Sequence, residues 1–317
     1  MFNSHRVYPL WKISPGLAAV VGIVAVGLYC LGVIPGQPGA GRVPGGPPRR
    51  SAKGPRAARA AKEAAPPATL AGLTAAIARE PKNPERYVDR AAVYFERKEY
   101  DSARADYEKA LRLDPENAEA LFGRGYLHLQ QDEDDLALAD FSEVIRLAPE
   151  VPEAYAARGS VYAARQDYPR AVADFNEALR LDPRCADASI GRGKARRDQK
   201  DYDGAVADFQ QANRLEPDSP EGYNELAWVW ATCPRADLRR GDLALEYAGK
   251  ACQLSDWEDP LCLDTYAAAF ASLGEFDQAV RWQKKALGFT DNLSDTDLDE
   301  FRARLKLYEE HKPYRLE

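Results

Sequence analysis

The sequence predicts an all-α solenoid of stacked helical hairpins, preceded by one helix that crosses a membrane. Two observations support this prediction. Proline recurs every 34 residues, at Pro81, Pro115, Pro149, Pro183 and Pro217, and a fixed period of this length is typical of stacked two-helix units. Near the N-terminus, residues 16–34 carry no charge, and this run is long enough to cross the hydrocarbon core of a bilayer.

A short tail, residues 1–15, leads into the predicted transmembrane helix at residues 16–34. A helix of this length extends about 28 Å, close to the thickness of the bilayer core. A cleaved signal peptide is the alternative, but no small-residue cleavage site follows the run. Lysine and arginine are more numerous after the span than before it, which favours a cytoplasmic position for the rest of the chain. Export of the repeats is the opposite topology and stays open.

Residues 35–68 are rich in proline, glycine, alanine and arginine. We expect a disordered linker here, because this composition cannot bury enough apolar surface to offset chain entropy. Residues 1–68 have a net charge of +8, and the whole chain has −7, which leaves −15 for residues 69–317. The basic linker suits anionic lipid head groups, whereas the acidic remainder argues against nucleic-acid binding.

Four further positions follow the 34-residue period when the proline is numbered 32 in each unit. Small residues at positions 8 and 20 let two helices approach closely, and an aromatic residue at position 24 fills the space between hairpins. The proline ends the second helix of the unit. Position 8 is Ala91, Gly125, Gly159 and Gly193; position 20 is Ala103, Ala137, Ala171 and Ala205; position 24 is Tyr107, Phe141, Phe175 and Phe209; position 27 is Ala110, Val144, Ala178 and Ala212.

This pattern resembles the tetratricopeptide-repeat (TPR) family, and in its last repeats the chain resembles bacterial members. The resemblance covers residues 69–290 and implies an α-solenoid of about six hairpins after an N-terminal half repeat. Four full repeats begin at Pro84, Ala118, Pro152 and Ala186. A fifth begins at Pro220 and carries an insertion around Cys233, and a sixth begins at Pro260. Residues 291–317 are expected to form a capping helix and a tail, because a terminal repeat must shield its apolar face.

Arginine and aspartate recur together in the four full repeats, at positions 7 and 23. Both are replaced together in the fifth and sixth repeats, which indicates that the two positions touch. We expect a structural ion pair inside each hairpin, and a ladder of charges for a ligand is the alternative. The pairs are Arg90 with Asp106, Arg124 with Asp140, Arg158 with Asp174, and Arg192 with Asp208.

The family resemblance implies a concave groove, lined by the first helix of each hairpin, that holds an extended peptide or a partner helix. Positions 5, 9 and 12 of these leading helices are the expected lining. The candidate partner-binding residues are Phe95, Phe122, Tyr126, Lys194, Arg197 and Trp228. Aromatic residues of this kind dominate protein interfaces. The alternative for Phe95 and Phe122 is a place in the solenoid core.

No catalytic motif is present, and the carboxylates belong to repeat positions or turns, so we expect no enzyme activity. The five cysteines show no zinc-ligand spacing, and no cofactor, metal or small-molecule substrate is expected. The predicted function is a single-pass membrane scaffold that binds protein or peptide partners. Two alternatives stay open: an exported repeat protein in envelope assembly, and a regulatory subunit of a separate enzyme.

Overall fold

The computed structural model describes residues 69–289 and 293–316. The predicted transmembrane helix at 16–34 and the linker at 35–68 lie outside these residues. Within the described ranges, none of the helices combines the length and the apolar character needed to cross a bilayer.

Every regular element of the described residues is an α-helix, so the all-α solenoid prediction holds for this part of the chain. Helix α2 (Leu70–Arg79) is the half repeat. The six hairpins are α3 (Pro84–Glu96) with α4 (Tyr100–Leu113), α5 (Ala118–Gln130) with α6 (Asp134–Leu147), α7 (Pro152–Ala164) with α8 (Tyr168–Leu181), α9 (Ala186–Asp198) with α10 (Tyr202–Leu215), α11 (Pro220–Thr232) with α12 (Gly241–Leu254), and α13 (Pro260–Ser272) with α14 (Phe276–Ala286). Helix α15 (Asp295–Glu309) follows them.

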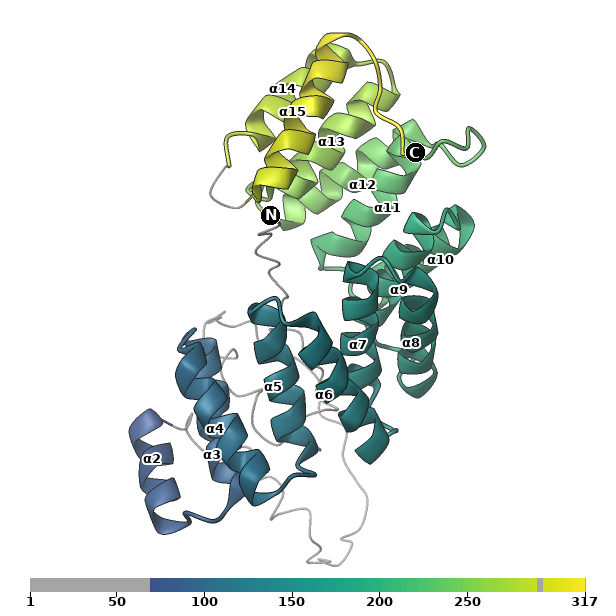
Figure 1. Cartoon of the computed structure of the whole chain (residues 1–317). Coiled ribbons are helices and arrows are strands. Elements are labelled where there is room, and N and C mark those ends of the chain that lie inside the picture. The colour runs from purple at the N-terminus through teal and green to yellow at the C-terminus, as the bar shows by residue number, and fades with distance from the viewer. Residues whose placement is uncertain (1–68, 290–292, 317) are drawn as a thin grey trace, which may run out of the picture. The chain divides into compact units, whose positions relative to one another are not determined.

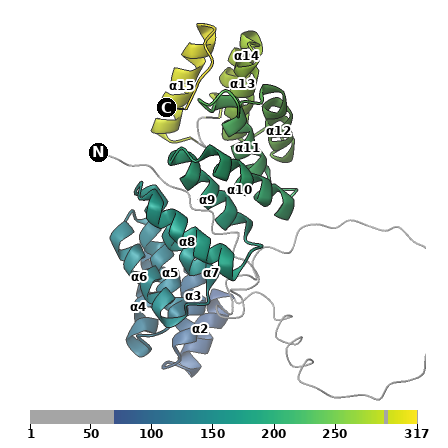
Figure 2. The ribbon, with the colours of Figure 1, turned by 90° about the vertical axis from the view of Figure 1, so that its right-hand side faces the viewer.

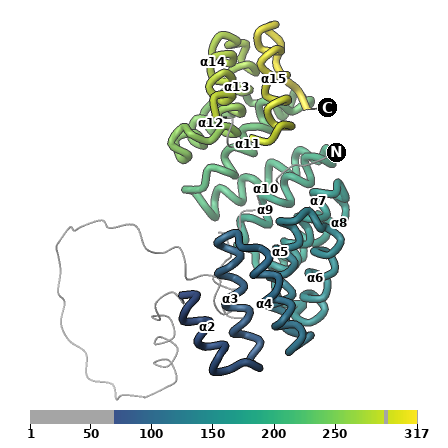
Figure 3. Tube along the Cα trace, turned by 60° about the vertical axis from the view of Figure 1, so that its left-hand side comes forward, coloured from purple at the N-terminus to yellow at the C-terminus, as the bar shows by residue number. Residues whose placement is uncertain are grey.

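The described chain forms two compact units that divide within α5, between Gly123 and Arg124. The N-terminal unit comprises residues 69–123, and α3 lies against both α2 and α4 in it (Figure 3). The core of this unit is formed by buried side chains that include Leu73, Tyr87, Val88 and Tyr107.

The C-terminal unit comprises the described residues from 124 onward. Its hairpins stack in chain order, and consecutive leading helices contact one another, α7 with α9, α9 with α11, and α11 with α13 (Figures 1 and 2). Helix α15 packs on α14. The leading helices therefore form one continuous face of this unit, which we call the inner face.

The recurring small and aromatic positions form the interior of each hairpin. In the C-terminal unit Phe141, Phe175 and Phe209 are at most 2% exposed. The glycines at position 8 make room for these rings: a Cβ atom on Gly193 would lie only 2.5 Å from Cε1 of Phe209. Close approach of two backbones across a buried ring explains why position 8 carries only glycine or alanine.

The turn inside five of the six hairpins uses a left-handed residue at position 15, and the fifth repeat, which carries the insertion, has Pro234 there. The φ angles are 61° at Lys98, 57° at Asp132, 61° at Gln166 and 68° at Lys200, and only the sixth repeat has glycine there, Gly274 at 82°. The following residue closes the helix end, as where the Glu99 N–H donates to the Tyr94 carbonyl at 2.9 Å. A left-handed residue with this hydrogen bond is a common way to end a helix.

The insertion in the fifth repeat occupies residues 233–240, between α11 and α12. Arg239 holds this loop, since its Nη1 donates to the carbonyls of Cys233 at 3.1 Å and Pro234 at 2.9 Å. The closing helix α15 starts with a capping box in which Ser294 and Asp297 satisfy each other's backbone N–H groups.

Candidate functional site

The arginines at position 7 each contact the aspartate of their own repeat through two hydrogen bonds. The Nε–Oδ2 and Nη2–Oδ1 distances are 2.7 and 2.8 Å for Arg90–Asp106, 2.9 and 2.7 Å for Arg124–Asp140, 2.8 and 2.8 Å for Arg158–Asp174, and 3.0 and 2.6 Å for Arg192–Asp208. The four aspartates are 3–7% exposed. Such two-point contacts between a partly exposed arginine and a buried aspartate hold the two helices of the hairpin together, so the geometry argues against a ladder of charges for a ligand.

Three of these arginines also reach back to the preceding repeat, which the sequence reasoning missed. Nη1 of the arginine donates to a polar side chain at position 25 of that repeat. The contacts are Arg90 to Thr74 at 3.2 Å, Arg158 to Ser142 at 3.1 Å, and Arg192 to Asn176 at 2.8 Å. A polar residue recurring at position 25 is the sequence signal that predicts this second contact.

A further ion pair in the sixth repeat does not follow the repeat positions. Asp264 on α13 lies 2.8 Å from Nε of Arg304 on α15, and Gln283 on α14 donates to the same carboxylate oxygen at 2.6 Å. Asp264 and Arg304 are 4% and 5% exposed. Burial raises the pKa of Asp264, although Arg304 and Gln283 oppose this shift. This network joins three helices and fixes α15 in place.

Position 5 of the leading helices belongs mainly to the core. Val88, Phe122 and Ile190 are 2–4% exposed, so a partner would meet almost none of their surface. For Phe122 the structure therefore favours the core alternative. A buried ring of this kind stabilises the hairpin and offers a partner almost no contact area.

Several side chains at positions 9 and 12 keep part of their surface in contact with solvent, whereas Ala92, Leu129 and Ala231 at these positions are buried. Phe95 is partly exposed and packs edge-on against Tyr100, with ring centroids 5.6 Å apart. Tyr126 is partly exposed and packs edge-on against Phe141 at 5.4 Å, and burial raises the pKa of its hydroxyl. The two residues lie in different units, so their joint action on one partner stays a prediction.

Lys194 and Arg197 of α9 meet two acids of α11 on the inner face. Nζ of Lys194 lies 2.8 Å from Glu221 and 3.4 Å from Glu225, and Nη1 of Arg197 lies 2.7 Å from Glu225. We call these four residues the inner-face charge network. The side chains of Lys194 and Glu221 remain 38% and 37% exposed. Both cations thus already have partners within the chain, and a ligand would meet a mixed-charge surface rather than two isolated cations.

Trp228, one turn further along α11, is covered by the C-terminal part of the chain. Its ring lies 5.6 Å from the ring of Tyr314, and the guanidinium of Arg304 sits 5.2 Å from its centroid. The structure therefore places this candidate residue under side chains that follow α14 in the sequence, an arrangement that no repeat position predicted.

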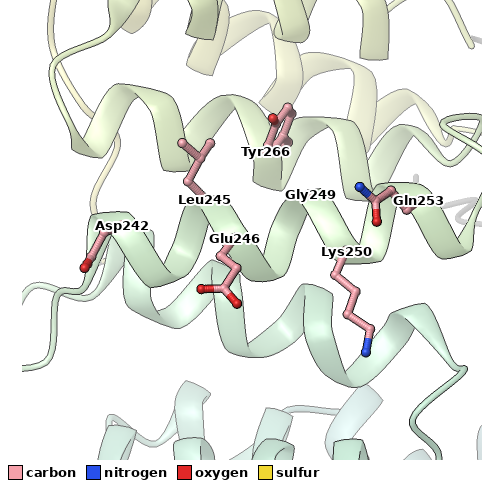
Figure 4. A pocket seen from close by; sticks show the side chains of 7 residues that line it. All are labelled: Asp242, Leu245, Glu246, Gly249, Lys250, Gln253 and Tyr266. Atoms are coloured by element: carbon pink, nitrogen blue, oxygen red, sulfur yellow. The ribbon is translucent and has the colours of Figure 1, made fainter.

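The described residues contain no cluster of three or more potential metal ligands. Burial raises the pKa of Cys185 to about 11 and that of Cys252 to about 12, which makes both thiols poor nucleophiles at neutral pH. An open hollow of about 590 Å³ lies over α12 and α13. Glu246 and Lys250 extend from α12 away from Tyr266 of α13 (Figure 4), and Nζ of Lys250 donates a hydrogen bond to the Tyr223 hydroxyl at 2.8 Å.

Two segments of the chain match models of repeat families. Residues 91–132 match a family described as TPR repeat, and residues 156–220 match a family described as tetratricopeptide repeat. None of the curated proteins matches the chain significantly.

Solved structures share the fold. The Cut9–Hcn1 hetero-tetramer of the APC/C superposes with a TM-score of 0.63 at 16% identity over 74% of this chain, which spans 45% of that one. PilW, a widely conserved type IV pilus biogenesis factor, gives 0.59 at 20% identity over 68% of this chain and 97% of its own. PilF of Pseudomonas aeruginosa gives 0.57 at 18% identity over 70% and 98%. At these identities the likeness is one of fold.

Proposed function

We propose that this chain, a tetratricopeptide-repeat protein, is a non-catalytic scaffold that is anchored in a membrane and binds partner proteins through the inner face of its C-terminal unit. Proteins of this family generally mediate protein–protein interactions.

One observation carries the choice of face. The positions that recur from repeat to repeat, 8, 20, 24 and 27, are buried throughout the four full repeats. In α7 and α9, by contrast, positions 9 and 12 differ and stay partly exposed: Ser160 and Ala163 on α7 become Lys194 and Arg197 on α9. A repeat protein carries its binding specificity at accessible positions whose residue type is not fixed by packing.

The inner-face charge network supports a partner segment that itself carries both signs of charge. Lys194 and Glu221 expose more than a third of their side chains while they hold each other. A partner carboxylate near Lys194 and a partner cation near Glu221 would each gain a charge-assisted hydrogen bond. Electrostatic complementarity of this kind sets specificity and orientation more than affinity. Tyr126, on the same unit, adds an apolar contact to the proposal.

The membrane anchor of the proposal is the uncharged run at residues 16–34, with the basic residues of 35–68 lying against anionic lipid. The excess of lysine and arginine after the run supports a cytoplasmic repeat domain.

A charge exchange tests the proposed face. In the double variant Lys194→Glu/Glu221→Lys the two side chains still attract each other, and Arg197 keeps its contact with Glu225. The new carboxylate at position 194 also lies near Glu225, so we expect a thermal midpoint a few degrees below that of the wild type with an unchanged helical spectrum. The charges presented to a partner are reversed. We expect crosslinking and affinity purification from membranes to recover the wild-type partners at least tenfold less efficiently with this variant.

The matched control exchanges a pair on the outer helix α8. Arg180 lies 2.6 Å from Glu177, with side chains 65% and 34% exposed. The variant Glu177→Arg/Arg180→Glu reverses the same charges on the other side of the hairpin and should recover the wild-type partners. Equal recovery with both double variants would contradict binding through the inner face.

A further inference from the structure

The chain turns back after α15 and runs toward α11 (Figures 1 and 3). His311 adopts a left-handed φ of 57°, and the Lys312 N–H donates to the Leu307 carbonyl at 2.8 Å. Residues 313–316 then continue without regular secondary structure and are partly buried. We call residues 313–316 the tail.

The tail satisfies carbonyl groups at the end of α11. The Leu316 N–H donates to the Thr232 carbonyl at 2.9 Å, and Nη1 of Arg315 donates to the Ala231 carbonyl at 3.0 Å. Both carbonyls belong to the last turn of α11, where a helix has no N–H groups of its own to offer. The arginine also places a positive charge at the negative end of the helix dipole.

The side chains of the tail cover the aromatic surface of α11. The ring of Tyr314 lies 5.6 Å from that of Trp228 and at 34° to it. The guanidinium of Arg304 sits 5.2 Å from the Trp228 ring and 5.5 Å from the Tyr314 ring, which adds cation–π attraction to both. Leu316 packs against the buried cluster that includes Leu226 and Trp230.

Helix α15 itself has anchors that are independent of the tail. Phe301 and Tyr308 are 1% and 0% exposed, and Arg304 is held by Asp264. The tail contributes side chains that are each only partly buried. Its removal would therefore uncover Trp228 and two carbonyls without displacing the core of α15.

These contacts are those of a bound peptide: one backbone and one side-chain hydrogen bond to carbonyls at a helix end, one aromatic side chain on a ring, and one aliphatic side chain on an apolar cluster. Resting on the proposed function, we propose that this end of α11 is a peptide-binding site and that the chain's own tail occupies it. The ligand it fits is an extended segment with an aromatic residue, a cation and an aliphatic residue in succession, as in Tyr314-Arg315-Leu316. A partner segment of this chemistry enters only when the tail leaves.

The site adjoins the inner-face charge network. Trp228 follows Glu225 by one turn on α11, and Glu225 is the residue that contacts Arg197. The tail consequently limits how far along the inner face a partner can extend. Because the tail is tethered to α15, it competes at a high effective concentration, and the full-length chain should bind a free peptide of the same sequence weakly.

The test uses the full chain and an N-acetylated, fluorescently labelled peptide with the sequence of residues 312–317. The double variant Tyr314→Ala/Leu316→Ala removes the side chains that hold the tail on α11. Fluorescence anisotropy of the labelled peptide measures its dissociation constant. We expect this constant to be at least tenfold lower for the double variant than for the wild-type chain. Adding Trp228→Ala to this variant should abolish the gain, and a peptide with both residues replaced by alanine should not bind.

No gain in affinity by the tail variant, with an unchanged helical spectrum, would overturn the proposal. If the wild-type chain forms dimers in which each tail binds the other copy, the tail does not occupy the α11 site of its own chain, and that part of the proposal is wrong. Should the tail variant unfold, carboxypeptidase trimming of the wild-type chain decides: excess peptide should accelerate loss of the C-terminal residues several-fold, and an unchanged rate refutes the proposal. The Lys194→Glu/Glu221→Lys experiment does not involve the tail, so it judges the scaffold function separately.

Discussion

Arg158 on α7 and Asp174 on α8 hold their hairpin together through two parallel hydrogen bonds, each 2.8 Å long. The side chains are 20% and 10% exposed. The hydrogen bond to Asp174 raises the pKa of Arg158, although partial burial opposes this shift. Because Arg158 also donates to Ser142 of the preceding repeat at 3.1 Å, one guanidinium links two successive hairpins.

Removing the carboxylate of this pair should destabilise the protein strongly. Asp174→Ala leaves the charge of Arg158 half-buried and without its partner, which costs about 3 kcal/mol in the free energy of unfolding. Urea unfolding followed by circular dichroism measures this loss. Glu177→Ala on the same helix breaks the exposed pair with Arg180 and should cost far less, because solvent screens an exposed ion pair. Similar losses for the two variants would show that burial does not set the strength of the Arg158–Asp174 pair.

Two glycines at position 8 should respond differently to the same substitution. A Cβ atom at Gly193 would lie 2.5 Å from the Phe209 ring, whereas at Gly159 the nearest atoms are 3.3 Å away. Gly193→Ala should therefore lower the free energy of unfolding by about 1–3 kcal/mol through overpacking. Gly159→Ala should be near neutral, because alanine's better helix propensity, worth about 1 kcal/mol, offsets the tight contact. Urea unfolding of both variants tests this, and equal effects would contradict the packing argument.

Glu119 should make the stability of the chain depend on pH. Burial, together with the carboxylates of Asp89 and Glu85, raises the pKa of Glu119 from 4.5 to about 7. A carboxyl group whose pKa is higher in the folded state than in the unfolded state binds its proton more tightly when folded. Its contribution to stability is therefore fully present below pH 4.5 and is lost as the pH rises to about 7.

The variant Glu119→Gln removes this titration. At pH 8 we expect it to be more stable than the wild type by at most about 3 kcal/mol, the linkage ceiling for such a shift. The favourable place of Glu119 in the first turn of α5 reduces the gain. Near pH 4.5 the two proteins should unfold alike. Thermal unfolding across this pH range is the measurement, with Glu150→Gln in an exposed turn as the control. A constant difference at all pH values would refute the assignment.

The full chain should stay in membranes after an alkaline carbonate wash, because residues 16–34 are uncharged and long enough to span the bilayer. Val24→Arg places a charge at the middle of this run, which costs about 2.5–3.5 kcal/mol of insertion free energy, and should shift part of the protein to the soluble fraction. Leu136→Arg, an exposed position of α6, is the control and should remain in the membrane fraction. Recovery of a soluble wild-type chain that begins near residue 40 would contradict a retained anchor.

The 34-residue period is sufficient to predict the repeat architecture, because the four full repeats carry the same residues at the positions that pack within and between hairpins. Proline and small residues at regular positions place the helix ends and the close approaches, and a buried ring follows at position 24. The Arg–Asp partners are 16 residues apart in each repeat, so joint replacement in later repeats is enough to predict contact between them.

Which of the candidate binding residues a partner can reach depends on packing that the repeat pattern does not describe. Phe122 and Tyr126 lie one helical turn apart, yet the first is 4% exposed and the second keeps more of its surface. The chain beyond the last repeat has no period, so nothing in the pattern indicates where it docks. Arg304 donates a hydrogen bond to Asp264, 40 residues earlier in the chain, and Arg315 donates one to the Ala231 carbonyl, 84 residues earlier. Trp228 is therefore covered because of where α15 and the tail pack, a result of long-range packing that no local periodicity encodes.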